Sequence, residues 1–235
     1  MNLPEISIAG EKLFEVFGFT VTNTFFLTLV VSLVVFLFSF FSLRHKSMIP
    51  KKLQNFWEFL LESLYNFFNS ITGDIAKTKE IFPLAGTLFL LILFCNLIEL
   101  IPGIGVFPFL RSPSSDLNFT FALATLSIIC VNFLALKRLG AVTYLKKFVS
   151  KNPVMLFAGI LEGVGEITRI ISLAFRLFGN LFAGEILLIV ISALFAYGLP
   201  LPFLGLEVLV GLIQAFIFPT LIVIFYTIAT QHVHE

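Results

Sequence analysis

Long apolar runs alternate with short polar segments along the 235 residues of the chain. The run from Val16 to Leu43 contains no charged residue, and it exceeds the ~20 residues that a helix needs to cross the hydrocarbon core of a bilayer. Two further apolar runs of spanning length cover residues 81–101 and 117–136. The pattern therefore predicts membrane-spanning helices over 16–43, 81–101 and 117–136.

Residues 51–72 follow a different pattern, because their apolar and polar positions separate at helical spacing. One face carries Trp57, Leu60, Leu61, Leu64, Phe68 and Ile71, and another carries Glu58, Glu62, Asn66 and Asn69. This separation predicts an amphipathic helix that lies in the membrane interface. A helix that packs its apolar face on a partner is the alternative.

The last two apolar segments, 153–197 and 203–231, are separated by Gly198, Pro200 and Pro202, which predicts a helical hairpin. The first segment is too long for one perpendicular span of ~20 residues, so we expect it to be tilted, bent or partly outside the hydrocarbon core. The predicted fold is an all-α integral membrane protein with a single membrane domain, 1–235. It has an N-terminal span, an interfacial helix, a two-span hairpin and a long tilted hairpin, with about five crossings in all.

Composition supports a lipid environment, since 58% of the residues are hydrophobic and only 12% are charged. A soluble domain of this size has too little interior to bury that much apolar surface. The net charge of +1, without a basic stripe, argues against nucleic acid as a partner. We expect no metal and no cofactor, because the chain has no Cys/His cluster and no phosphate-binding loop. Cys95 and Cys130 fall in apolar runs and are expected to be buried thiols.

The basic residues are distributed unevenly between the predicted loops. Eleven of the fifteen Lys and Arg flank the interfacial helix or lie within 137–151, whereas only Lys12 and Arg111 fall on the opposite side. The positive-inside rule then predicts an outside N-terminus and an inside C-terminus.

The long hairpin carries polar groups that are costly in a membrane. A charged side chain at mid-bilayer costs about 2.5–3.5 kcal/mol on insertion scales, so each must face protein, water or another polar group. These residues are Glu162, Glu166, Arg169, Arg176, Asn180, Glu185, Glu207 and Gln214.

Helical geometry sorts these polar groups into two regions. At ~100° per residue, Glu162, Glu166, Arg169, Arg176 and Asn180 share one stripe, and Glu185 projects from roughly the opposite face. A hairpin that closes near residue 196 would put Glu207 level with Glu185. The same register would put Gln214 level with Arg176.

Simpler interpretations exist for several of these residues. Glu166 and Arg169 have the spacing of a helical ion pair, and Gln214 could simply cross-link two helices. Glu162 could lie in the inner interface or take part in proton access. Arg176 has no acid nearby on its stripe, and this predicts a partner on another chain.

Five motifs along the chain resemble those of subunit a (subunit 6) of the F-type ATP synthase membrane sector. They are "NLIELIP", "PSSDLN", "LEGVGEITRIIS", "SLAFRLFGNLFAGE" and "LIQAFIF", in the order typical of that family. The resemblance covers the chain from the first span to the C-terminus, and the block around Arg176 is its most specific part.

The resemblance implies a non-catalytic, proton-conducting stator subunit that provides two offset half-channels to a ring of c subunits. Arg176 matches the essential arginine that faces the ring carboxylate, with Asn180 and Gln214 as polar neighbours. Residues matching the outside path are Glu99, Glu185 and Glu207, and Glu162 matches the inside exit. Many relatives carry one acid and one histidine at positions 185 and 207, whereas this chain has glutamate at both.

The resemblance also implies peripheral-stalk b subunits and the rest of the ATP synthase as partners, in a bacterial plasma (inner) membrane. Two other classes compete with this interpretation. A secondary ion transporter would show an inverted repeat and its own substrate site, and the sequence shows neither. A structural subunit of a respiratory complex would leave Arg176 without a role.

Overall fold

A computed structural model describes residues 12–16, 19–44, 52–99, 112–140, 144, 153–194 and 200–231. The elements are β1 (Lys12–Val16), β2 (Phe19–Thr22), α1 (Asn23–Arg44), α2 (Lys52–Thr72), α3 (Ile75–Ile98), the short 3-10 helix η1 (Pro113–Ser115), α4 (Leu117–Leu139), α6 (Pro153–Leu194) and α7 (Pro200–Ala229). The predicted turn around Gly198, most of the basic 137–151 loop and the C-terminal histidines lie outside the described residues.

The predicted all-α membrane class is confirmed. Four helices are long and apolar enough to cross a membrane, within Ile75–Ile98, Leu117–Leu139, Gly159–Ser192 and Pro200–Ala229, and α1 adds a shorter apolar stretch, Asn23–Leu37. The first helix begins at Asn23 rather than near Val16, because β1 and β2 pair as an antiparallel hairpin before it. Hydropathy alone did not separate that apolar hairpin from the helix that follows.

Local side chains set where two of the middle helices begin and end. Asp74 precedes α3 and accepts a hydrogen bond from the backbone N–H of Ala76 at 2.8 Å, and Asp116 does the same for Asn118 before α4 at 2.9 Å. These are N-cap bonds, which satisfy N–H groups that a helix cannot satisfy itself. Gly140 ends α4 with φ +83°, a conformation that favours glycine. Because of the Asp74 cap, α3 starts six residues before the predicted 81.

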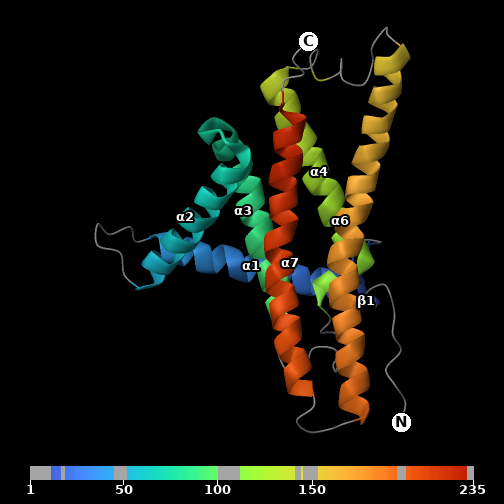
Figure 1. Ribbon diagram of the computed structural model, residues 1–235. Helices are drawn as coiled ribbons and strands as arrows, with labels where there is room; N and C mark the ends of the chain where they lie inside the picture. Colours follow the sequence, from blue (N-terminus) through green and yellow to red (C-terminus); the bar gives the residue numbers. More distant parts are fainter. Residues whose placement is uncertain are drawn as a thin grey trace.

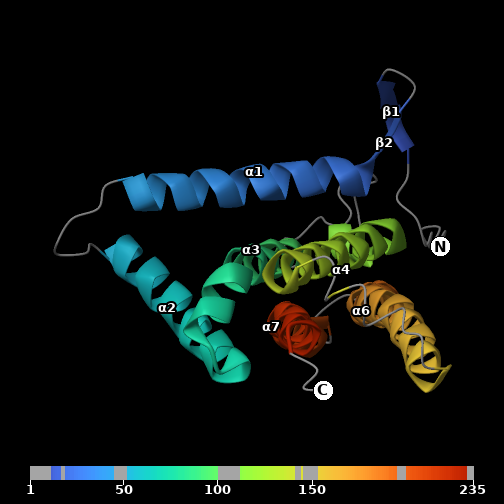
Figure 2. The same ribbon diagram turned by 90° about the horizontal axis from the view of Figure 1, so that it is seen from above.

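The helices are arranged in layers. Seen from above, α6 and α7 form one layer, α3 and α4 the next, and α1 lies on the far side of α3 and α4 (Figure 2). The same view looks down α7 while α1 is seen lengthwise, so α1 runs across the direction of α7 (Figures 1 and 2). No described element covers the side of the α6–α7 layer that faces away from α3 and α4.

The amphipathic helix α2 packs at the edge of these layers, against α3 and α7 of its own chain. Leu64 and Phe68 on its apolar face are buried in the main core, whereas Phe56 and Phe59 remain exposed. Phe56 and Phe59 lie outside the apolar face that the sequence defined. Every residue of that face is buried or half-buried, so α2 turns it toward helices of its own chain.

The core is continuous from α2 to α7. Its largest fully buried side chains come from every layer except α1: Phe68, Ile81, Ile92, Leu173, Leu177, Phe218, Ile222 and Tyr226. In water, burying one such side chain stabilises a folded protein by roughly 1.5–3 kcal/mol. In lipid, the association of helices is stabilised instead by close packing and by hydrogen bonds between helices.

Buried polar ties fix α7 against its neighbours. Asn96 of α3 donates from Nδ2 to the backbone oxygen of Gly211 at 3.0 Å, and it accepts from the hydroxyl of Ser114 at 2.7 Å. A Cβ at position 211 would lie 3.2 Å from the Cβ of Asn96, so glycine permits this close approach. At the other end of α7, Tyr226 donates to Glu80, which also pairs with Arg138 at 3.0 Å.

We expect Asn96→Ala to lower the free energy of unfolding by about 2 kcal/mol, because it leaves the oxygen of Gly211 and the hydroxyl of Ser114 buried without their partner. Thermal unfolding of the detergent-solubilised protein measures this. Asn118→Ala is the matched control, since the side chain of Asn118 is exposed. Equal melting temperatures for both variants would contradict the role assigned to Asn96.

Candidate functional site

The two long helices meet through an amide pair. Asn180 of α6 donates from Nδ2 to Oε1 of Gln214 on α7 at 3.2 Å, and Gln214 is 2% exposed. The register expected from the hairpin put Gln214 level with Arg176. The hydrogen bond joins Gln214 to Asn180, one helical turn from Arg176 along α6. Arg176 and Asn180 share one stripe of α6, so Gln214 contacts the polar stripe that the sequence defined, at the position of Asn180.

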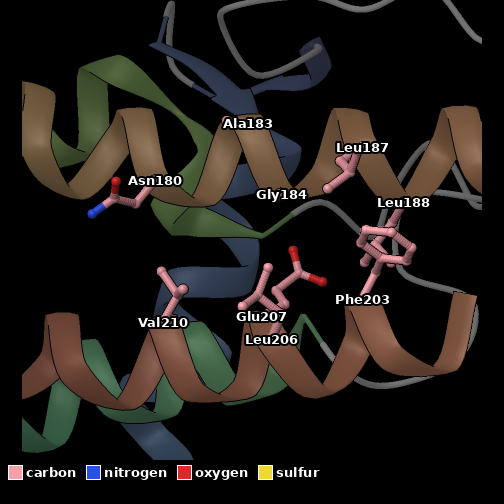
Figure 3. A pocket seen from close by; sticks show the side chains of 9 residues that line it. All are labelled: Asn180, Ala183, Gly184, Leu187, Leu188, Phe203, Leu206, Glu207 and Val210. Atoms are coloured by element: carbon pink, nitrogen blue, oxygen red, sulfur yellow. The ribbon is translucent and has the colours of Figure 1, made fainter.

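Further along the hairpin, Glu207 of α7 lies against the backbone of α6. An ideal Cβ at position 184 would be 2.7 Å from Oε1 of Glu207, so the glycine leaves room for the carboxylate. Figure 3 shows this carboxylate pointing into a pocket of about 210 Å³ between the two helices. The pocket is lined by apolar side chains, together with Asn180 at one end and Glu207.

Three carboxylates gather near this pocket. Glu99, Glu185 and Glu207 lie close enough for their charges to interact, and Glu99 and Glu207 are only 8% and 7% exposed. Neither oxygen of Glu99 or of Glu207 has a hydrogen-bond partner among the described residues. Buried polar groups normally have partners, and neighbouring carboxylates in low dielectric do not all ionise together. Such a cluster is suited to exchanging protons with water.

Arg176 lies apart from the carboxylates. Its side chain is exposed on α6, and none of the hydrogen bonds or ion pairs between described residues involves it. Arg169, two turns earlier on the same helix, instead lies over the ring of Phe225 at 5.1 Å. A guanidinium stays charged in essentially any environment, so Arg176 presents a fixed positive charge at the surface of an apolar helix.

The acids near the start of α6 form a separate group. Glu162 is half-buried, and Glu166 accepts a hydrogen bond from Nδ2 of Asn132 on α4 at 2.9 Å. The ion pair that the spacing of Glu166 and Arg169 allowed is not among the ion pairs of the described residues. The structure thus brings together Glu99, Glu185 and Glu207, joins Asn180 to Gln214, and leaves Arg176 and Glu162 at separate positions.

The chain is similar to known proteins along most of its length. The family model described as ATP synthase A chain matches residues 24–227. The chain belongs to the ATP synthase A chain family. It is 34% identical over 232 residues to ATP synthase subunit a of Desulfosudis oleivorans, which covers 95% of this chain and 96% of the relative. The chain is 35% identical over 211 residues to subunit a of Syntrophobacter fumaroxidans, a match that covers 88% of this chain and 84% of the relative. It is 34% identical over 215 residues to subunit a of Moorella thermoacetica, where the match covers 92% of this chain and 91% of the relative.

Membership of the ATP synthase A chain family makes this chain a multi-pass subunit of the F-type ATP synthase membrane sector, which serves ATP synthesis and proton transport. Among the described residues, no three His, Cys, Asp or Glu side chains are arranged so that they could hold a metal ion together at the site. Its chemistry is that of carboxylates, amides and one guanidinium.

Sequence reasoning missed several residues that shape this ATP synthase A chain site. Gly184 was seen only as part of a motif, although it provides the space for Glu207. Asn132 and Tyr144 were not considered, because they lie on or after another helix and carry no charge. Only contacts between distant segments reveal them.

We expect Gly184→Ala to displace the Glu207 carboxylate, because the new methyl group would occupy the place of Oε1. The end of a glutamate side chain moves easily, so the complex should still assemble. ATP-driven proton pumping should fall several-fold, which corresponds to a rise of about 1 kcal/mol in the free-energy barrier to proton transfer. Gly163→Ala is the control, since a Cβ there meets nothing within 4 Å. Unchanged pumping by Gly184→Ala, measured in vesicles containing the whole ATP synthase, would show that the position of Glu207 is unimportant.

Proposed function

We propose that this chain is the proton-conducting stator subunit of a rotary ATP synthase, with two offset half-channels that open to a ring of c subunits. Arg176 stands between the half-channels and faces the ring carboxylate. The subunit conducts protons and does not itself catalyse ATP synthesis.

The guanidinium of Arg176 carries this proposal, because it is exposed and forms no ion pair with the residues that the structure describes. A rotor carboxylate must lose its proton inside the membrane, and a nearby positive charge favours the ionised form. Because arginine does not deprotonate, it cannot pass a proton across, and the two half-channels stay separate. The uncovered side of the α6–α7 layer is where a ring would fit (Figure 2).

The outside half-channel would run along the buried carboxylates. Protons would pass Glu99, Glu207 and Glu185 and reach the ring near Asn180 and Gln214. The close approach of the three acids and the pocket beside Glu207 support this route (Figure 3). With glutamate at both 185 and 207, the cluster can share a proton without a histidine.

The inside half-channel would leave the ring near Glu162. We propose a bacterial plasma (inner) membrane with the N-terminus outside and the C-terminus inside, as the basic residues predict. Each proton that moves down a potential of 100 mV releases about 2.3 kcal/mol. The partners are the c-ring, the peripheral-stalk b subunits and the remaining ATP synthase subunits.

We expect Arg176→Ala to abolish ATP-coupled proton pumping while the complex still assembles, because the variant keeps the helix and removes only an exposed charge. Pumping is followed by quenching of a pH-sensitive dye in vesicles, and assembly by co-purification with the c-ring. Arg169→Ala is the matched control: it removes a neighbouring cation that lies over Phe225 and should keep most of the pumping. Full coupled pumping by Arg176→Ala would defeat the proposal.

We expect the double variant Glu185→Gln/Glu207→Gln to slow proton uptake from the outside by a factor of about 100, the lower end of the range for loss of an acid–base group. Glutamine keeps the shape of both side chains but cannot exchange protons. Proton flux driven by an imposed potential is the measurement, with Glu58→Gln on the exposed face of α2 as the control. A double variant with normal flux would remove the carboxylate relay.

A further inference from the structure

Glu166 makes the contact that points beyond the proposed path. Its Oε2 accepts from the amide of Asn132 at 2.9 Å, and the hydroxyl of Tyr144 lies 3.5 Å from its Oε1. Both donors are neutral. The cation nearest in sequence, Arg169, lies over Phe225 instead of pairing with this carboxylate. Glu166 is therefore a half-buried acid without a salt bridge to the described residues.

The two donors beside the Glu166 carboxylate are an amide and a phenol, and neither carries a positive charge. A paired cation would hold the carboxylate in its charged form, whereas amide and hydroxyl donors do so more weakly. Burial, together with the charges of Glu166 and Glu162, raises the pKa of Tyr144 to about 12. The phenol thus stays protonated at physiological pH and remains a donor. Asn132 and Tyr144 therefore both remain hydrogen-bond donors to Glu166 at physiological pH.

The position of Glu166 lies between the inside exit and the arginine. At 1.5 Å per residue, it is about 6 Å along α6 from Glu162 and about 15 Å from Arg176. Its side chain leans toward α4, where it meets Asn132, and Arg176 is exposed. A proton that travels along α6 from the region of Arg176 toward Glu162 would pass Glu166.

We propose that Glu166 is a further proton-exchanging residue on the inside half of the path, held in place by Asn132 and Tyr144. In each transfer, water gives a proton to the Glu166 carboxylate, and the resulting carboxyl group gives its proton through water to Glu162. One O–H bond forms as another breaks, and nothing is oxidised or reduced. The inference rests on the proposed function and extends its inside half-channel.

The competing role is a purely structural tie between α4 and α6, and two substitutions separate the roles. Glu166→Gln keeps an oxygen that accepts from Asn132 and Tyr144, but it cannot exchange a proton. Asn132→Leu removes the tie and keeps the carboxyl group. If Glu166 exchanges protons, Glu166→Gln lowers proton flux more than Asn132→Leu does. If Glu166 only ties α4 to α6, Asn132→Leu causes the larger loss of flux.

The test measures ATP-driven and potential-driven proton flux of the complete ATP synthase in vesicles, with assembly checked by co-purification. We expect Glu166→Gln to lower both fluxes on the order of tenfold, since water can bypass a single lost group only in part. Asn132→Leu should keep about half or more of the flux, and Glu166→Asp should recover part of the loss because its carboxyl group remains.

Normal flux in Glu166→Gln overturns the inference, and so does a loss in Asn132→Leu as large as that in Glu166→Gln. Arg176→Ala, measured in parallel, separates this inference from the function on which it rests. If Arg176→Ala pumps normally, the proposed function itself fails. If Arg176→Ala is inactive and Glu166→Gln is normal, only the role of Glu166 fails.

Discussion

An unneutralised guanidinium at the surface of an apolar helix is the constraint around which this molecule is organised. Arg176 is exposed on α6 and forms no ion pair with the described residues, although it sits in a segment long enough and apolar enough to span a membrane. A charge at that depth is unfavourable unless something polar faces it. Among the described residues no acid pairs with it: Glu166 accepts from Asn132, and the acids near Glu207 lie further along the hairpin. We propose that a partner outside the chain offsets this cost, and membership of the ATP synthase A chain family implies other ATP synthase subunits as neighbours.

The polar ties around α7 give the acids their positions. Asn96 holds α7 to α3 through the backbone of Gly211, and Gln214 holds it to Asn180 of α6 one turn later. In lipid, where apolar contact between helices is no stronger than contact with acyl chains, such hydrogen bonds and close backbone approaches determine register. These two hydrogen bonds fix α7 relative to both α3 and α6. Glu207, on the same helix, is thereby held beside Gly184. A shift of one turn would move the carboxylate out of the space that the glycine provides.

Much of the fold could be predicted from hydropathy and helix signals, because lipid demands long apolar helices whatever their packing. The helix α4 begins at the expected residue 117 and ends three residues after 136, whereas α3 begins six residues before 81 because Asp74 caps it. The hairpin of β1 and β2 was missed, since its apolar residues look like the start of the first span. Within the site, residue types were visible in the sequence, but their partners were not. The amide pair of Gln214 with Asn180 and the contact of Glu166 with Asn132 were not visible, because both depend on how helices are turned toward each other.

The length of α6 has a geometric consequence. Its 42 residues extend about 63 Å, roughly twice the ~30 Å thickness of a hydrocarbon slab, so a straight rod of this length fits within the slab only when inclined by about 60° or more. Glu162 and Glu185 lie 23 positions apart, or about 35 Å along the rod. At that inclination they are displaced sideways by about 30 Å but in depth by only about 17 Å. Glu162 and Glu185 would then lie beneath different patches of the membrane surface, although both belong to α6. In a helix perpendicular to the membrane, they would lie one above the other.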